Sequence, residues 1–126
     1  MSRKRRILLV DDTETILLFL KTILAGRDFH FLTARNGAEA IEVARSDRPD
    51  LILLDVMMPV MDGFEACRRI KGDPDLKSTP VVIVTTKSEA ANSERLRIAG
   101  ADDYVLKPIK KLELVDKIER LLNPLS

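Results

Sequence analysis

The chain has 126 residues, enough for one domain with a buried core and too few for two. Its hydrophobic content of 45%, charged content of 33% and net charge of +1 are ordinary for a globular protein and give no overall field that favours nucleic acid. One cysteine, Cys67, and one histidine, His30, exclude an intrachain disulfide and a zinc site of the usual His/Cys type. No apolar run approaches the roughly 20 residues that span a membrane, so we expect a cytoplasmic protein.

A basic cluster, Arg3-Lys4-Arg5-Arg6, stands at the start of the chain and could contact phosphates by its charge. It has no interleaved aromatic residues and lies at a terminus, so we predict a solvated tail. The apolar run that follows, residues 7–10, is too short for the core of a signal peptide.

Five short apolar runs then alternate with five segments of helical periodicity. An unbroken aliphatic run bounded by turn signals is typical of a strand buried on both faces. The expected strands are residues 6–10, 29–34, 50–54, 80–84 and 103–106. The first expected helix is capped by Asp12 or Thr13 and ends at Gly26, and the second starts at the cap Asn36 and includes Ala44. The third includes Phe64 and stops at Gly72, and the fourth runs from about Ser88 to Ala99. The fifth has its apolar stripe over residues 114–122 and is closed by Pro124.

This alternation predicts an α/β fold in which helices cover both faces of a parallel sheet. The second strand is partly polar, which is typical of a sheet edge. The fourth helix, about 88–99, has a thin apolar face formed by Ala91, Leu96 and Ala99. We therefore expect this helix to be loosely held and able to move.

Polar side chains stand where four of the strands end. The first strand ends in Asp11-Asp12, the third in Asp55, the fourth in Thr85 and the fifth in Lys107. Ligands of open α/β sheets bind at this carboxyl edge. Three neighbouring carboxylates repel unless a cation neutralises them, and their hard oxygens suit Mg²⁺. Together with an ammonium and a hydroxyl, they predict a phosphoryl-accepting site with Asp55 as the nucleophile.

Each of these residues also has a structural explanation when it is considered alone. Asp11 and Asp12 suit a helix N-terminus, Asp55 a turn, Thr85 a helix cap and Lys107 a solvated strand end. All of these explanations would have to hold at once on one edge of one sheet, so the combination favours a functional site.

Four motifs resemble those of a receiver domain of two-component response regulators, the CheY-like superfamily. They are Ile-Leu-Leu-Val-Asp11-Asp12, Leu-Leu-Asp55-Val-Met-Met-Pro-Val-Met-Asp62-Gly63, Val-Val-Ile-Val-Thr85 and Gly-Ala-Asp-Asp-Tyr104-Val-Leu-Lys107-Pro108. Their order and spacing match over essentially the whole chain. The resemblance implies a single receiver domain over residues 1–126, with a core of about 6–122 between short tails. It also implies a flavodoxin-like doubly wound (βα)5 fold with strand order 2-1-3-4-5.

The resemblance further implies a role for each site residue. Asp55 would accept a phosphoryl group from the phosphohistidine of a sensor histidine kinase or phosphotransfer protein. Lys107 and Thr85 would bind that group, and Thr85 and Tyr104 would act as switch residues. The Lys107–Pro108 bond would be cis. The ligands of Mg²⁺, or of Mn²⁺ in its place, would be Asp11, Asp12, Asp55 and the backbone carbonyl of Met57.

The implied output is a change in the face made by the fourth helix, the fifth strand and the fifth helix, which would bind a downstream protein or a fused output domain. The protein would not be an enzyme, except that it promotes its own phosphorylation and dephosphorylation. It would be a monomer or a phosphorylation-promoted dimer. It would not bind nucleic acid or membrane directly. Phosphatases with an aspartate nucleophile carry a second Asp at the position of Met57, which argues against that class. A receiver-like module that binds protein without phosphorylation remains the alternative.

The residues that border the site depart in part from the family's common pattern. Thr86 follows Thr85 where relatives often carry a smaller residue, and Met57 and Lys87 occupy variable positions that border the site. The chain is expected to be either a stand-alone receiver or a piece of a longer regulator.

Overall fold

The computed structural model describes residues 4–91 and 93–123. Within these residues five strands and six helices follow one another, with two helices between β4 and β5 and one after each of the other strands. The strands are β1 (Arg5–Val10), β2 (Phe29–Ala34), β3 (Leu51–Asp55), β4 (Val81–Thr85) and β5 (Asp103–Leu106). The helices are α1 (Glu14–Ile23), α2 (Gly37–Asp47), α3 (Gly63–Gly72), α4 (Lys87–Ala90), α5 (Ser93–Ala99) and α6 (Lys111–Leu122).

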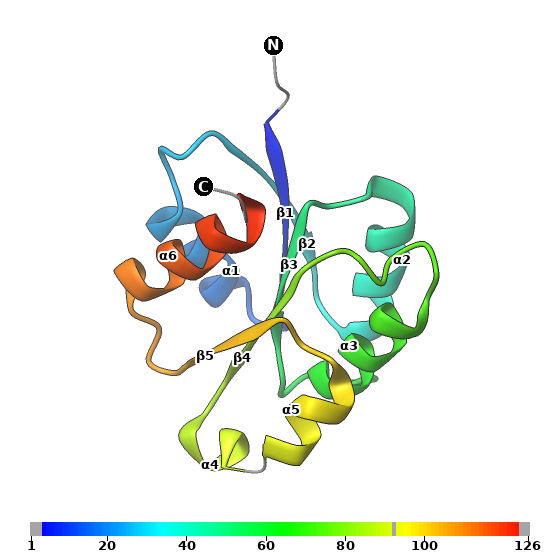
Figure 1. Cartoon of the computed structure of the whole chain (residues 1–126). Coiled ribbons are helices and arrows are strands. Elements are labelled where there is room, and N and C mark those ends of the chain that lie inside the picture. The colour runs from blue at the N-terminus through cyan, green and yellow to red at the C-terminus, as the bar shows by residue number, and fades with distance from the viewer. Residues whose placement is uncertain (1–3, 92, 124–126) are drawn as a thin grey trace.

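The strands form one parallel sheet in the order β2-β1-β3-β4-β5, which confirms the predicted flavodoxin-like α/β fold and its strand order. Helices α1 and α6 cover one face, and α2, α3 and α5 cover the other (Figure 1). Successive side chains of a strand point to opposite faces, so Ile7 and Leu9 join the α1–α6 core while Leu8 and Val10 join the other. Both faces need apolar side chains, which explains why β1, β3 and β4 are almost continuously aliphatic.

Polar side chains cap the start of α2, as the sequence predicts, and of α3, where no cap was predicted. The side chain of Asn36 accepts a hydrogen bond from the Glu39 backbone N–H at 2.9 Å, and that of Asp62 accepts one from Glu65 at 2.9 Å. Thr13 is the N-cap residue of α1, but within the described part of the chain its side chain makes no capping hydrogen bond.

The prediction of a single helix over about 88–99 is wrong. The segment forms two short helices, α4 and α5, and Ala91, expected on the apolar face, is exposed. Two causes are visible in the sequence: Asn and Ser, the residue types at positions 92 and 93, favour helix starts over helix interiors, and residues 87–90 carry no apolar stripe. None of the four residues of α4 is buried.

The second of these helices, α5, is held to the domain by more than its thin apolar face. Ala99 is buried and Leu96 is half-buried against the core. The guanidinium of Arg95 lies 4.3 Å from the centre of the Phe64 ring and 3.4 Å from a carboxylate oxygen of Asp62. Polar and cation–π contacts with α3 therefore supplement the apolar contacts of α5.

The basic start of the chain is exposed at Lys4 and Arg5, as the predicted solvated tail implies, but the strand begins one residue earlier than expected. Strand β1 begins at Arg5, and the Arg6 guanidinium donates to the Asp47 carbonyl at 2.6 Å. Arg3 and Pro124 lie outside the described residues. Across residues 4–91 and 93–123, no helix has the length and apolar character needed to cross a membrane.

Candidate functional site

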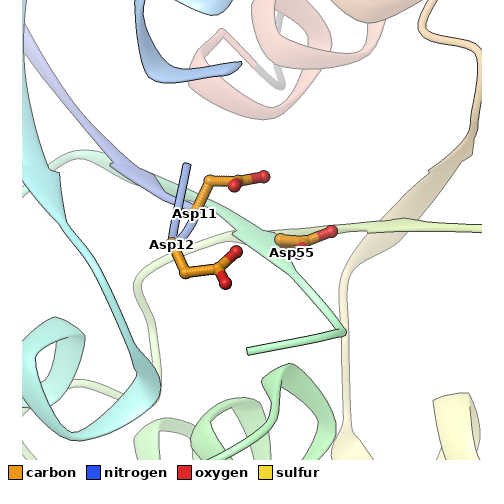
Figure 2. Close-up of side chains that lie close together, drawn as sticks. All are labelled: Asp11, Asp12 and Asp55. Atoms are coloured by element: carbon orange, nitrogen blue, oxygen red, sulfur yellow. The ribbon is translucent and has the colours of Figure 1, made fainter. Parts of the chain in front are cut away.

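Three carboxylates meet where the neighbouring strands β1 and β3 end. Asp55 is the last residue of β3, and Asp11 directly follows β1, where its N–H donates to the Ala34 carbonyl at 3.1 Å. One oxygen each from Asp11, Asp12 and Asp55 lies within 4.8 Å of the other two. Figure 2 shows the three side chains side by side at this edge of the sheet. The structure thus brings together the three acidic residues that the sequence predicts.

Burial makes this acidic cluster electrostatically costly. Asp11 and Asp55 are only 5% and 4% exposed, whereas Asp12 is exposed. Burial raises the pKa of Asp11, although a hydrogen bond from the Thr13 N–H opposes it, and the nearby Asp55 raises it further. Burial likewise raises the pKa of Asp55 above its ordinary value despite the proximity of Lys107. The charged forms of both carboxyl groups are therefore disfavoured without more positive charge.

Lys107 supplies part of that charge. Its ammonium lies 2.8 Å from Asp55 Oδ1. No residue in 4–91 or 93–123 besides Lys107 offers this buried oxygen a polar partner. Partial burial lowers the pKa of Lys107, but the carboxylate of Asp55 raises it more, so the ammonium stays charged. Its backbone N–H donates to the Thr85 carbonyl at 2.8 Å, and the Lys107–Pro108 bond is cis.

The donor set fits a divalent cation. The oxygens of two buried carboxylates and one exposed carboxylate converge, and among the described residues only the Lys107 ammonium approaches Asp55 Oδ1 as a polar partner. Hard anionic oxygens of this kind are preferred by Mg²⁺. Met57, whose carbonyl was predicted as a further ligand, lies in the loop that leaves β3 for α3.

Two glycines hold this loop against the site. The Gly63 N–H donates to the Val56 carbonyl at 2.9 Å, and a Cβ at position 63 would lie 2.1 Å from the Asp55 carbonyl oxygen. The Gly37 N–H donates to the Met61 carbonyl at 3.2 Å. Position 63 therefore admits only glycine while α3 starts this close to the end of β3.

Thr85 ends β4 beside this cluster and is fully buried, with a partner that the sequence reasoning missed. Its hydroxyl donates to Glu89 Oε1 at 3.1 Å. The same oxygen accepts the Thr86 backbone N–H at 3.0 Å, and the Glu89 N–H donates to the Thr86 hydroxyl at 3.2 Å. Thr86 and Glu89 thus form a capping box at the start of α4. The Thr-x-x-Glu spacing of residues 86–89 was the available signal.

Known proteins are similar to this chain over most of its length. The family model described as response regulator receiver domain matches residues 7–119. The chain belongs to this family. It is 40% identical over 116 residues to the response regulator PleD of Caulobacter vibrioides, covering 92% of this chain but 26% of PleD, so it spans about a quarter of that relative.

Two crystal structures show the same fold in other receiver domains. The signal receiver domain of a histidine kinase from Syntrophus aciditrophicus is 40% identical, with a TM-score of 0.90 and coverage of 97% of this chain and 92% of that one. The receiver domain of sensor histidine kinase PA1611 from Pseudomonas aeruginosa is 28% identical, with a TM-score of 0.86 and coverage of 95% and 98%. That structure holds a magnesium ion coordinated in its active-site cleft.

Tyr104, the predicted aromatic switch residue of this receiver domain, points outward. Its side chain is 40% exposed, and the Lys117 ammonium lies 5.3 Å from the centre of its ring. Lys117 also donates to the Tyr104 carbonyl and pairs with Asp103 at 3.2 Å. An inward turn of the ring would break this cation–π contact.

An apolar cavity of about 420 Å³ opens beside the carboxylates of the receiver domain. Asp55 and Lys107 stand among its lining residues, and side chains of α1 form much of the rest, including Ile16 and Phe19. Next to it on α1, Leu18 is exposed. The site is therefore flanked by apolar surface on its α1 side.

Proposed function

We propose that this receiver domain accepts a phosphoryl group on Asp55 from the phosphohistidine of a sensor histidine kinase or phosphotransfer protein. The observation that carries this proposal is the convergence of Asp11, Asp12 and Asp55 with Lys107 at one edge of the sheet. Hydrophobic burial explains none of these side chains. Buried like charges at the edge where α/β sheets bind ligands indicate a site built for an ionic reaction.

In the proposed reaction, a carboxylate oxygen of Asp55 forms a bond to phosphorus while the P–N bond of the donor phosphohistidine breaks. The donor nitrogen keeps the bonding electron pair and takes a proton from solvent. Lys107, which pairs with Asp55 beforehand, then pairs with the phosphoryl oxygens. The Thr85 hydroxyl donates a hydrogen bond to the same group. Hydrolysis of the acyl phosphate returns the carboxylate.

The residues that would hold Mg²⁺, or Mn²⁺ in its place, are Asp11, Asp12, Asp55 and the backbone carbonyl of Met57. When bound, the cation supplies the positive charge that offsets the three carboxylates and the incoming phosphoryl group. The magnesium ion in the PA1611 receiver domain supports this assignment.

The apolar surface beside Asp55 suits the phosphodonor partner. Exposed Leu18 and Phe19, together with the adjoining cavity, offer contacts to an apolar helix face that carries the phosphohistidine. The output would be a change in the face made by α4, α5, β5 and α6, where Tyr104 lies, read by a downstream protein, a fused output domain or a second copy of the chain. A kinase partner would place the protein in the cytoplasm.

Intact-mass measurement after incubation with acetyl phosphate and Mg²⁺ tests the proposal. We expect one added phosphoryl group on the wild type, and none on Asp55→Asn or on wild type in EDTA. An Asp116→Asn variant serves as the matched control, because this carboxylate lies exposed on α6 and pairs with Arg120. An adduct that persists on Asp55→Asn would refute Asp55 as acceptor. No adduct on the wild type, with no NMR response to beryllofluoride, would favour a binding module that acts without phosphorylation.

A further inference from the structure

Glu89 accepts a hydrogen bond from the hydroxyl of Thr85, the residue that ends β4 beside the site. Its Oε1 accepts hydrogen bonds from the Thr85 hydroxyl at 3.1 Å, the Thr86 N–H at 3.0 Å and the Thr86 hydroxyl at 3.0 Å. The fully buried Thr85 is thus held by a side chain from the start of α4. One carboxylate oxygen links the end of β4 to that helix.

Glu89 is ionised while it makes these contacts. Partial burial raises its pKa, but the hydrogen bonds from Thr86 and Thr85 and the nearby Lys107 ammonium together hold the pKa below its ordinary value. An ionised carboxylate only accepts hydrogen bonds, so Glu89 depends on the donors that face it.

A threonine hydroxyl has one proton to donate. If Thr85 donates it to a phosphoryl oxygen on Asp55, a lone pair of the hydroxyl oxygen faces Glu89 Oε1 at the observed 3.1 Å separation. Two acceptors at this distance repel, so the two hydrogen bonds of Thr85 exclude each other. The Glu89 charge also lies near Lys107, the cation that the phosphoryl group needs.

We propose that Glu89 is a positioning residue that competes with the phosphoryl group for the Thr85 hydroxyl, so that phosphorylation must release Glu89. The inference rests on the proposed function and adds a residue to it. Because the same Oε1 completes the capping box with Thr86, its release also removes a cap from α4. No residue of α4 is buried, so the cap would be lost from a helix that has little apolar packing.

The experiment measures the affinity for beryllofluoride in the presence of Mg²⁺ by NMR titration of the full chain. Glu89→Ala removes the competing acceptor, and Glu89→Gln replaces it with an amide whose NH₂ group can donate to Thr85. We expect both variants to bind about 3- to 10-fold more tightly than the wild type, the range for one hydrogen bond to a partly exposed charge. The matched control is Glu94→Gln, because Glu94 is an exposed carboxylate on α5 that pairs with Arg97, and it should leave the affinity unchanged.

A double-mutant cycle separates the competition for the hydroxyl from simple charge repulsion. In a Thr85→Ala background, Glu89→Ala should leave the affinity unchanged, because the contested proton is gone. An equal gain in both backgrounds would mean that Glu89 acts through its charge alone, and no gain in either would mean that it does not act on the site; each result overturns the inference. Wild-type protein that neither binds beryllofluoride nor gains a phosphoryl group overturns the proposed function itself. Binding by the wild type with an inert Glu89 overturns only the inference.

Discussion

Replacing Asp11 by Asn should stabilise the metal-free protein. Asp11 and Asp55 are both buried, and a carboxylate oxygen of one lies within 4.8 Å of a carboxylate oxygen of the other. Two unit charges at this separation repel by about 3.5 kcal/mol at an effective dielectric constant of 20. Lys107 and solvent at the mouth of the site offset part of this energy, so we expect the free energy of unfolding to rise by about 1–2 kcal/mol. For a chain of this size, the melting temperature should rise by roughly 3–7 °C.

The pH dependence of this gain has a definite sign. Burial, with the charge of Asp55, raises the pKa of Asp11 in the folded protein above its ordinary value. Between the ordinary pKa and the raised one, the folded state keeps a proton on Asp11 that the unfolded chain has released. The contribution of Asp11 to the free energy of unfolding therefore falls as the pH rises through this range. The advantage of Asp11→Asn should accordingly be full at pH 7–8 and shrink as the pH falls through the raised pKa of Asp11.

Unfolding in urea, followed by circular dichroism in EDTA and again with Mg²⁺, measures both effects. The asparagine oxygen can still accept the Thr13 N–H that Asp11 now accepts at 2.9 Å, so the local turn is preserved. Added Mg²⁺ should stabilise the wild type more than the variant, because the variant lacks one ligand. Asp116→Asn, on the exposed face of α6, is the control for the loss of a surface charge. A variant that is no more stable in EDTA and gains as much from Mg²⁺ as the wild type would refute the argument.

Gly63→Ala should lower the free energy of unfolding by about 3 kcal/mol or more, because its Cβ would lie 2.1 Å from the Asp55 carbonyl oxygen. Gly72→Ala is the control and should change it by less than about 1 kcal/mol, because its Cβ would meet no neighbouring atom of the described residues within 4 Å. Equal urea midpoints for the two variants would contradict this expectation. Cys67 is buried, donates to the Ala99 carbonyl at 3.3 Å and has its pKa raised by burial to about 12. At pH 8 its reaction with a thiol reagent should be more than about 100-fold slower in the folded protein than in urea, and similar rates would show that this part of the core opens readily.

Local patterns were sufficient for most of the fold. The expected strands agree with the observed ones to within one residue at each end, because an aliphatic run between turn residues has few other ways to bury both faces. The carboxyl edge followed from the same pattern, since a polar residue that ends such a run marks the point where the strand reaches the edge of the sheet. Asp55 and Thr85 prove to be the last residues of β3 and β4.

The orientation of side chains at that edge could not be predicted in the same way. The Thr86–Glu89 spacing predicts a helix cap, but only the path of the chain from β4 into α4 brings Glu89 to the hydroxyl of the preceding Thr85. The outward position of Tyr104 depends on Lys117, thirteen residues along the chain, which lies against its ring. The division of residues 88–99 into α4 and α5, by contrast, had a signal in the sequence, because residues 87–90 carry no apolar stripe.

Stability and charge are distributed unequally in this receiver domain. The sheet is held by aliphatic side chains on both faces, with residues such as Leu53 and Ile83 almost fully buried, so the core does not depend on the carboxyl edge. The edge can therefore keep Asp11 and Asp55 in a costly arrangement that an asparagine would relieve. The least buried helix, α4, is tied to this same edge through Glu89. A change of charge at Asp55 would thus reach a helix with no buried residue, while the buried sheet that positions the site stays in place.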